Sequence, residues 1–522
     1  MVYICGCIPA RIKQALAELP ETLDETYERT LRDINKADWE FAHRLFQFVA
    51  VASRPLRVEE LAELLTFDFK AGSIPQIHEG WRLEDPSDAV LATCSSLFTI
   101  VDGGSLSETI DAESVSDSPR NAAAFEFSDD DFFAEETDDE FRSGKVVQFA
   151  HFSVKEFLTS ARLAEATDII LQRYHVSMTP AHTLATQACL GILLHLDDDV
   201  VTSGSLDKWP LAQYAARHWN YHARFEDVWR NVEDGMKQLF DPRKPYLTIC
   251  SRINQGPSRQ DESPLEPPGT PLHYAALWGF DSIVEFLILE HSQDMNSYSF
   301  VGDMTPLHLA SLRGHVKAAR VLIEHGADVT VLAEDRVTPL HLASVVGRVE
   351  IARMLIERGA DVTAQVEDGK TSLHAASMMG QVEIARMLIE CGADVTAQDN
   401  ADRTPFLLGL EEGKVEVARM FIECGADITV QDADGDTLLH RALQRSQVEV
   451  ARMLIECGAN VTTQNKDGKT PLHLASQAGE VEIARMLIER SVDVTVQGED
   501  GETPLHLHFP TSPILTCRRK RR

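Results

Sequence analysis

The sequence predicts a mainly α protein in which a helical domain with a small sheet and a helical connector precede a solenoid of stacked helix pairs. The first observation is that threonines recur every 33 residues in the second half of the chain, each opening a copy of one short pattern. A fixed period of this length is typical of supersecondary units that bury their apolar faces only by stacking on one another. The second observation is that the first half has no such repeat and combines apolar runs of helical spacing with two strand-like runs. The repeated threonines are Thr305, Thr338, Thr371, Thr404, Thr437, Thr470 and Thr503, with Thr270 ahead of them.

One period of the repeat predicts two helices. Thr338 is expected to accept hydrogen bonds from backbone N–H groups at a helix start, and Pro339 follows where a missing N–H costs nothing. Gly347 interrupts the chain before residues 349–356, whose apolar side chains recur at helical spacing. Gly359 is expected to end this second helix in a left-handed cap. A turn then leads to the next threonine.

The pattern Thr-Pro-Leu-His-x-Ala, followed by two helices and Gly-Ala-Asp-Val, resembles the ankyrin repeat. The resemblance covers residues 269–509 as seven full copies and an eighth that is cut short. It implies an α-solenoid that binds a partner through its surface. The copy at Thr404 lacks the histidine and the alanine, and the copy at Thr437 lacks the proline. We expect these two adjacent units to be the loosest part of the stack.

The first half of the chain predicts three helices and a β-hairpin. Residues 21–31 open an amphipathic helix, residues 41–50 form a more buried helix, and residues 58–65 form a short third helix. Residues 94–101 and 145–151 predict the two strands of a hairpin. Three helices and a hairpin make a winged helix.

These segments carry a second resemblance. Together with residues 210–219, they look like the part of fungal NLR-like (STAND) proteins that lies between the NACHT nucleotide-binding module and the ankyrin array. That part is similar to the winged-helix domain named after GPI inositol-deacylase. In such receptors the NTPase is a switch, the winged helix a lever and the repeats a sensor. The resemblance implies a winged-helix domain at residues 1–170, a helical connector and linker at 171–268, the repeats at 269–509 and a basic tail at 510–522. The segments that carry it begin at Leu19, Arg54, Cys94, Ala150 and Pro210.

Nucleotide hydrolysis is not expected from the residues of this chain. A phosphate-binding loop needs glycine, four further residues and then Gly-Lys-Ser/Thr. Gly369-Lys370-Thr371 supplies the ending, but Ala364 stands where the first glycine is needed. The same Gly-Lys-Thr ending occurs at residues 468–470, but Thr463 stands where the first glycine of that loop is needed. The sequence leaves open whether an NTPase module is supplied in trans or the chain is a fragment of a longer protein.

Other catalytic signatures are absent from the sequence. It contains no Gly-x-Ser-x-Gly elbow and no His-Glu-x-x-His helix. His151 and Ser153 could be imagined as a base and a nucleophile, but we expect Ser153 to cap a helix over residues 154–158. We therefore expect no enzymatic activity and no cofactor.

Histidines and cysteines recur in register with the repeats, and neither set predicts a metal site or a disulfide. Neighbouring repeats lie about 10 Å apart, whereas a disulfide needs Cα atoms within about 7 Å. Metal ligands converge to about 2 Å from one ion. We expect reduced thiols, and histidines that hydrogen-bond within the hairpin turns. The residues are His308, His341, His374, His440, His473, Cys391, Cys424 and Cys457.

The formal net charge of −33 argues against a general affinity for nucleic acids or acidic membranes. The sequence contains no apolar run of about 18 residues, and its start lacks the features of a secretory signal. We therefore expect a cytoplasmic protein.

Two charged segments allow alternative interpretations. Residues 103–144 interleave acidic residues with phenylalanines and predict a disordered insertion at the tip of the wing. The insertion is either a solvated spacer or a linear motif, and Ser128 in it resembles an acidic-directed phosphorylation site. The basic run from Arg518 to Arg522 is either a nuclear import signal or an out-of-frame extension.

The ankyrin resemblance places one pair of residues per repeat on a concave binding face. Our favoured hypothesis is a non-enzymatic interaction and signalling scaffold, similar to the ligand-sensing half of an NLR-like receptor. The alternative is a nuclear transcriptional regulator that combines the winged helix, the acidic segment and the import signal. The acidic helix at 58–65, with Glu59, Glu60 and Glu63, argues against it because carboxylates repel DNA phosphates. The candidate protein-binding residues are Leu312, Arg313, Val345, Val346, Met378, Met379, Glu411, Glu412, Gln444, Arg445, Gln477 and Ala478.

Overall fold

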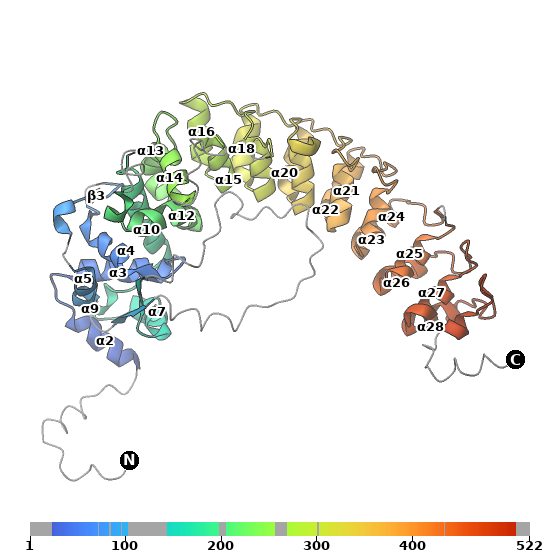
Figure 1. The fold of residues 1–522 in the computed structure, drawn as a ribbon, viewed down its shortest axis with the longest axis horizontal. Helices are drawn as coiled ribbons and strands as arrows, with labels where there is room; N and C mark the ends of the chain where they lie inside the picture. Colours follow the sequence, from blue (N-terminus) through green and yellow to red (C-terminus); the bar gives the residue numbers. More distant parts are fainter. Residues whose placement is uncertain are drawn as a thin grey trace, which may run out of the picture. The chain divides into compact units, whose positions relative to one another are not determined.

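A computed structural model of the chain (Figure 1) describes residues 23–70, 72–82, 85–94, 97–102, 144–197, 205–255, 269–299, 302–432 and 434–507. The chain divides into two compact units. The first comprises Met1–Pro271 and Leu289–His291, and the second comprises Leu272–Ile288 and Ser292–Arg522. The prediction of a mainly α fold with a helical solenoid in its C-terminal part is confirmed. The acidic segment with Ser128 and the basic run from Arg518 to Arg522 lie outside the described residues.

A three-stranded antiparallel sheet lies in the first unit. Its strand order is β1-β5-β4, and Val147 of β5 pairs with Leu56 on one side and Ile100 on the other. The predicted hairpin is thus confirmed, and β1 is a third strand that the sequence did not reveal. The elements are α2 (Leu23–Asp33), α3 (Trp39–Val51), β1 (Leu56–Arg57), α4 (Val58–Glu63), α5 (Pro86–Cys94), β4 (Phe98–Asp102) and β5 (Lys145–Phe149), with a separate two-stranded sheet of β2 (Phe67–Asp68) and β3 (Gln76–Ile77).

The helix that leads into the hairpin is α5, not the predicted helix at 58–65. α4 begins at Val58 directly after β1, and Val58 and Leu61 are fully buried. α4 packs against α5, which precedes β4 in the chain. α5 was not predicted from the sequence because its apolar residues do not lie on one helical face. Those of α4 lie on one face, which packs against the core.

Helices that follow the hairpin complete the first unit. α10 packs against both α12 and α3, so the residues expected to form a separate connector share a core with the N-terminal part. Trp219 and Trp229 are among the largest fully or almost fully buried side chains of this core. The helices are α7 (Phe152–Leu158), α8 (Ala161–Ala164), α9 (Ile169–Gln172), α10 (Met178–Leu193), α12 (Leu211–Arg224), α13 (Glu233–Phe240) and α14 (Tyr246–Gln255).

A chain of buried polar side chains joins three helices of this core. The Ser53 backbone N–H donates to Tyr214 Oη at 3.3 Å, and Tyr214 Oη lies 2.7 Å from His222 Nε2. His222 Nδ1 in turn lies 3.0 Å from His182 Nδ1. Burial lowers the pKa of His182 to about 4 and that of His222 to about 3, so both imidazoles are neutral near pH 7. This series of hydrogen-bonded groups links the end of α3 with α12 and α10.

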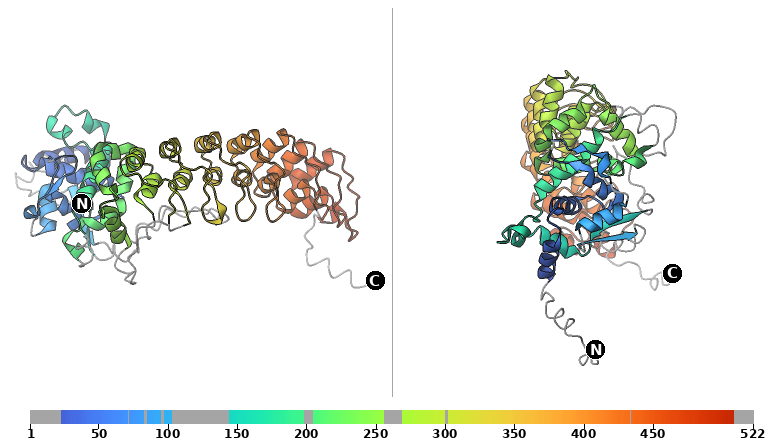
Figure 2. Two further views of the ribbon diagram at one scale, coloured as in Figure 1. Left: turned by 90° about the horizontal axis from the view of Figure 1, so that it is seen from above. Right: turned by 90° about the vertical axis from the view of Figure 1, so that its left-hand side faces the viewer.

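Paired helices in two layers form the second unit (Figure 2, left). From α17 to α29, the first helix of each repeat contacts the first helix of the next, and from α18 to α28 the second helices do the same. The first helices are α15 (Pro271–Trp278), α17 (Pro306–Arg313), α19 (Pro339–Val346), α21 (Ser372–Met379), α23 (Pro405–Glu411), α25 (Leu438–Gln444), α27 (Pro471–Ala478) and α29 (Pro504–Leu507). The second helices are α16 (Asp281–Leu289), α18 (Val316–Glu324), α20 (Val349–Glu357), α22 (Val382–Glu390), α24 (Val415–Glu423), α26 (Val448–Glu456) and α28 (Val481–Glu489).

The caps that the sequence predicted begin and end these helices. Thr338 Oγ1 accepts from the His341 backbone N–H at 3.3 Å, and His341 Nδ1 accepts from the Thr338 backbone N–H at 3.3 Å. This is a reciprocal capping box. Gly347 has φ 80 at the end of α19, and a Cβ there would lie 2.4 Å from Gln381 Oε1 of the next repeat. The left-handed backbone conformation favours glycine here, and a Cβ would in addition make the Gln381 side chain shift.

Among the residues that the structure describes, no helix is long and apolar enough to cross a bilayer.

Candidate protein-binding site

In the repeats that begin at Thr305, Thr371, Thr437 and Thr470, a buried histidine forms a hydrogen bond to the next repeat. His308 Nε2 donates to the carbonyl of Val337 at 3.0 Å, and His374 Nε2 donates to that of Arg403 at 3.0 Å. The predicted hydrogen bonds in the hairpin turns are confirmed, and the accepting residue immediately precedes the threonine of the following repeat. The same bond joins His440 to Lys469 and His473 to Glu502.

Hydrogen bonding fixes the tautomer of these histidines. Thr305 Oγ1 lies 2.9 Å from His308 Nδ1, and the Thr305 backbone N–H also donates to that nitrogen. Nδ1 therefore accepts, and Nε2 carries the proton that it donates to the carbonyl. Burial lowers the pKa of His308 and of His341 to about 4. Both ring nitrogens of His308 are engaged, which leaves none to bind a metal ion.

The repeat at Thr404 lacks this histidine. Leu407 stands in its place, and its backbone N–H still donates to Thr404 Oγ1 at 3.3 Å. The helix cap is thus retained, while the side-chain bond to the following hairpin is lost. Leu407, Leu410, Leu438 and Ala442 line a crevice at this junction that is too narrow to hold a water molecule.

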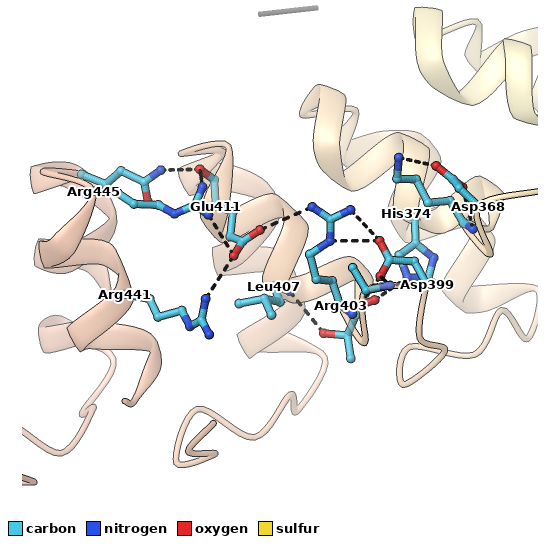
Figure 3. A network of polar contacts seen from close by, with 12 residues as sticks. Asp368, His374, Asp399, Arg403, Leu407, Glu411, Arg441 and Arg445 are labelled. Carbon is cyan, nitrogen blue, oxygen red and sulfur yellow. Dashed lines mark hydrogen bonds and ion pairs between the residues drawn. The ribbon is translucent and has the colours of Figure 1, made fainter. Parts of the chain in front are cut away.

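An ion-pair network spans the junction instead (Figure 3). The Glu411 carboxylate lies 3.1 Å from Arg445 Nη2, 3.5 Å from Arg441 Nη1 and 3.9 Å from Arg403 Nη1. Arg445 Nη1 also donates to the Glu411 backbone carbonyl at 3.2 Å. Arg403 belongs to the same repeat as Glu411, and the other two arginines belong to the next repeat. The network therefore bonds two repeats through one carboxylate.

Two aspartates orient two of the three arginines. Arg403 donates from Nε at 3.0 Å and from Nη2 at 2.8 Å to Asp399 Oδ2. Arg441 donates from Nε at 2.8 Å and from Nη2 at 2.6 Å to Asp432 Oδ2. Burial alone would raise the pKa of Asp399, but the hydrogen bonds from Arg403 and from backbone N–H groups outweigh it and hold that pKa below its usual value. Asp399 therefore remains ionised at neutral pH.

The carboxylates of the network lie beneath the guanidinium groups. The side chains of Asp399, Glu411 and Asp432 are 1%, 7% and 23% exposed. Those of Arg403, Arg441 and Arg445 are 36%, 36% and 46% exposed. A partner that approaches this surface meets the positive groups first, although the six charges sum to zero.

The other predicted binding residues differ in accessibility. Leu312 and Val345 are buried, at 7% and 6% exposure, and belong to the core and not to an accessible face. Val346 and Met378 are half-buried, and Met379 is exposed. Arg313 and Glu411 are half-buried as residues, and Glu412, Gln444, Arg445, Gln477 and Ala478 are exposed. We define the first-helix face as the surface of Val346, Met378, Met379, Arg403, Glu411, Glu412, Arg441, Gln444 and Arg445.

The sequence prediction missed Arg403 and Arg441. Arg403 is the residue before the repeat threonine, a position that the repeat pattern leaves unspecified. Arg441 stands where the other repeats have Leu309, Leu342 or Ala375. A charged residue at an apolar position of the pattern was the available signal, because such a residue is retained only where it finds a partner.

The possible dyad in the first unit forms a helix cap. Ser153 Oγ lies 2.6 Å from His151 Nδ1, and the Ser153 backbone N–H donates to the same nitrogen at 3.2 Å. The cap residue of α7 is therefore His151, and the prediction that Ser153 caps this helix was wrong. Tyr27 Oη, 2.8 Å from Ser153 Oγ, ties α2 to this helix start.

Two of the three carboxylates of α4, those of Glu60 and Glu63, are buried, whereas Glu59 is exposed as the sequence predicted. Arg54 forms two hydrogen bonds to Glu60, at 2.9 and 2.8 Å. Arg82 donates to Glu63 Oε1 at 2.8 Å, and the Leu211 backbone N–H donates to Glu63 Oε2 at 2.7 Å. Burial raises the pKa of Glu63 to about 7. These groups hold the first unit together, so their charge says little about affinity for DNA.

The cysteines Cys391, Cys424 and Cys457 are free thiols. In the described part of the chain, no group of three or more His, Cys, Asp or Glu side chains has an arrangement that could hold a metal ion.

Comparison with protein-family models matches ankyrin repeats, as a model of three copies, to residues 249–333, 272–366, 331–399, 373–465 and 406–498. The C-terminal part of the chain thus consists of ankyrin repeats. Among curated proteins, "Azaphilone pigments biosynthesis cluster protein L" of Monascus ruber is 27% identical over 332 residues, which are 60% of this chain and 61% of that protein. The chain thus spans about three fifths of the length of this relative.

Proposed function

We propose that this protein is a non-enzymatic signalling scaffold that binds another polypeptide through its first-helix face. The observation that carries the proposal is the continuous contact between successive first helices from α17 to α29, which presents recurring positions as one surface. Ankyrin repeats have a role in protein–protein interaction. The name of the fungal relative refers to a biosynthesis cluster and specifies no reaction.

Affinity capture with the tagged full chain tests this function. Met379→Glu places a charge at an exposed apolar position of the first-helix face, and we expect it to reduce recovery of the captured partner at least about fivefold, equivalent to about 1 kcal/mol. Arg353→Glu is the matched control, since Arg353 lies on α20 of the second-helix layer with a half-exposed side chain. Equal losses for both variants, or no loss for Met379→Glu, would contradict binding at this face.

The first unit supports a finer proposal. From α3 onward its elements follow in the order α3-β1-α4-β2-β3-α5-β4-β5, and the order of the three-stranded sheet is β1-β5-β4. Apart from the small sheet of β2 and β3, this arrangement fits a winged helix like the lever of NLR-like receptors. An NTPase module supplied in trans would then be the switch. Purified chain should hydrolyse ATP no faster than buffer, and turnover that survives repurification would overturn this assignment.

A nuclear regulator is not favoured by the described residues. α5, the helix that leads into the hairpin, has the sequence Pro-Ser-Asp-Ala-Val-Leu-Ala-Thr-Cys and offers no Arg, Lys, Asn or Gln to read base edges. We therefore retain a cytoplasmic location as the proposal. Microscopy of tagged chain with and without residues 518–522 tests it, and exclusive nuclear residence that depends on those residues would overturn it.

A further inference from the structure

The more exposed groups of the ion-pair network on the first-helix face are positive, although the whole chain is acidic. The formal net charge is −33. Around Glu411, however, three guanidinium groups are more exposed than the carboxylates that they bind. Long-range attraction would thus not bring an anion here, but an acidic group already near this surface would meet guanidinium groups first.

The orientation of these guanidinium groups is fixed before any partner arrives. A guanidinium group has five N–H donors. Arg403 uses Nε and Nη2 on Asp399, and Arg441 uses Nε and Nη2 on Asp432. The Nη1 groups of both arginines make only the longer contacts of 3.9 and 3.5 Å to Glu411. A carboxylate of a partner would therefore find donors whose side-chain entropy has already been lost, which favours affinity.

Apolar side chains lie one and two repeats away on the same face. Met378 and Met379 occupy the positions of Glu411 and Glu412 in the preceding repeat, and Val346 that of Met379 in the repeat before. Met379 is 36% exposed. Methionine adapts to varied apolar shapes. The face thus offers apolar contacts followed by arginines along the direction of the stack.

We propose that this part of the first-helix face binds an acidic segment of a separate partner protein, whose carboxylates contact Arg403, Arg441 and Arg445 and whose apolar side chains contact Met379 and Val346. The inference rests on the proposed scaffold function and specifies the chemistry of its partner. A nucleic acid also carries anionic groups, but the charge of −33 would repel its extended backbone along the whole chain. A short acidic peptide has to contact only the arginines around Glu411.

A direct binding measurement with the full chain tests the proposal. The probe is a fluorescent synthetic peptide of sequence Phe-Glu-Phe-Ser-Asp-Asp-Asp-Phe-Phe-Ala-Glu-Glu-Thr-Asp-Asp-Glu-Phe, which copies residues 125–141 because they combine carboxylates with phenylalanines. The control peptide has Asn and Gln in place of Asp and Glu. We expect the acidic peptide to bind at least about tenfold more tightly than the control, since the direct contacts are charge-assisted hydrogen bonds. Equal affinity for both peptides would overturn the proposal.

Two variants of opposite expected effect assign the binding to this face. Arg445→Gln should weaken binding of the acidic peptide about five- to twentyfold, because it removes an exposed guanidinium group. Glu412→Gln should tighten binding about twofold, because it removes an exposed carboxylate beside the arginines. Arg320→Gln on the second-helix layer is the control and should change nothing. Circular dichroism and the thermal midpoint establish that each variant is folded, and unchanged affinity for folded Arg445→Gln would overturn the proposal.

Two further comparisons separate the remaining outcomes. A variant in which a neutral linker of equal length replaces residues 103–143 should bind the peptide as the full chain does. If its affinity is more than about tenfold higher, the chain's own acidic segment occupies the face, and the assignment to a separate partner is overturned. If Met379→Glu abolishes partner capture but the peptide does not bind, the scaffold function stands and the acidic chemistry is wrong.

Discussion

Two junctions between repeats stack the same kinds of helix but differ in their polar contacts. At the histidine junction, between the repeats of Thr305 and Thr338, buried His308 donates to the Val337 carbonyl at 3.0 Å. At the arginine junction, between the repeats of Thr404 and Thr437, half-buried ion pairs converge on Glu411. Apolar packing and helix caps therefore suffice to place the helix pairs, and the polar contact across the junction is exchangeable. The arginine junction places half-exposed guanidinium groups on the first-helix face, whereas the polar contact of the histidine junction is buried.

A fall in pH should produce the largest difference in stability between the two junctions. His308 has an ordinary pKa of 6.5 when unfolded and about 4 when folded, because burial disfavours the charged form. The unfolded chain therefore binds protons between pH 6.5 and 4 that the folded chain does not bind. The stability from neutral His308 is complete above the unfolded pKa and is lost as the pH falls towards 4. Burial lowers the pKa of His341 in the same way, to about 4.

Hydrogen exchange at two pH values measures this difference. After correction for intrinsic rates, backbone protection in α17 and α19 should fall between pH about 7 and 5, a range chosen from the ordinary pKa of histidine. Protection in α23 should fall less, because its repeat has Leu407 instead of histidine. The lowered pKa of Asp399 lies below this range and does not interfere. An equal loss in the three helices would contradict the role of the histidines.

His308→Ala should have the largest effect among single substitutions. It removes the bond to the Val337 carbonyl and half of a capping box, and it leaves a cavity at a fully buried position. We expect a loss of about 3 kcal/mol in the free energy of unfolding, measured with urea. Leu407→Ala is the matched substitution at the arginine junction and should cost only about 1 kcal/mol, since Leu407 is half-buried and its side chain forms no hydrogen bond. Equal losses would show that the histidine acts by packing alone.

The capping of the repeats could be predicted from the sequence because its bonds are local. Thr338 and His341 are three residues apart, and their spacing alone places both at one helix start. Gly359 was likewise predictable, since a left-handed cap with φ 88 needs glycine. Residues 58–65 and the hairpin strands were found by their apolar patterns.

The arginine junction and the order of helices around the sheet could not be predicted in this way. Arg441 and Glu411 are 30 residues apart, and their contact exists only once two repeats stack. Strand β1 has two residues and is defined by its pairing with β5, not by its composition. Burial also reversed the interpretation of Glu60, which the sequence placed at the surface and the structure places under Arg54 and Arg57.

Glu411→Gln should weaken the arginine junction and remove its salt dependence. The substitution keeps the size of the side chain but removes the charge on which Arg441 and Arg445 converge, and we expect a loss of about 1–2 kcal/mol. In the wild type, raising the salt concentration to about 0.5 M should reduce protection in α23 and α25 more than in α17, since half-exposed ion pairs are screened. Glu412→Gln is the control and should leave stability within about 0.5 kcal/mol. The expectation that these two repeats are the loosest is tested by the same exchange data.

We expect the smallest loss of stability when an ion pair of the second-helix layer is removed. Ion pairs also connect successive repeats in this layer. Arg320 Nη2 lies 2.8 Å from Glu350, and Arg452 Nη2 lies 2.9 Å from Glu482. The side chains of Arg320 and Glu350 are 49% and 59% exposed, so water and salt screen the pair and ordering two long side chains offsets much of its energy. Arg320→Gln should therefore cost less than about 0.5 kcal/mol in urea unfolding, and high salt should not change that value. A loss as large as that of Glu411→Gln would mean that exposed and buried ion pairs stabilise the stack equally. The burial of the Glu411 carboxylate would then not distinguish the arginine junction in stability.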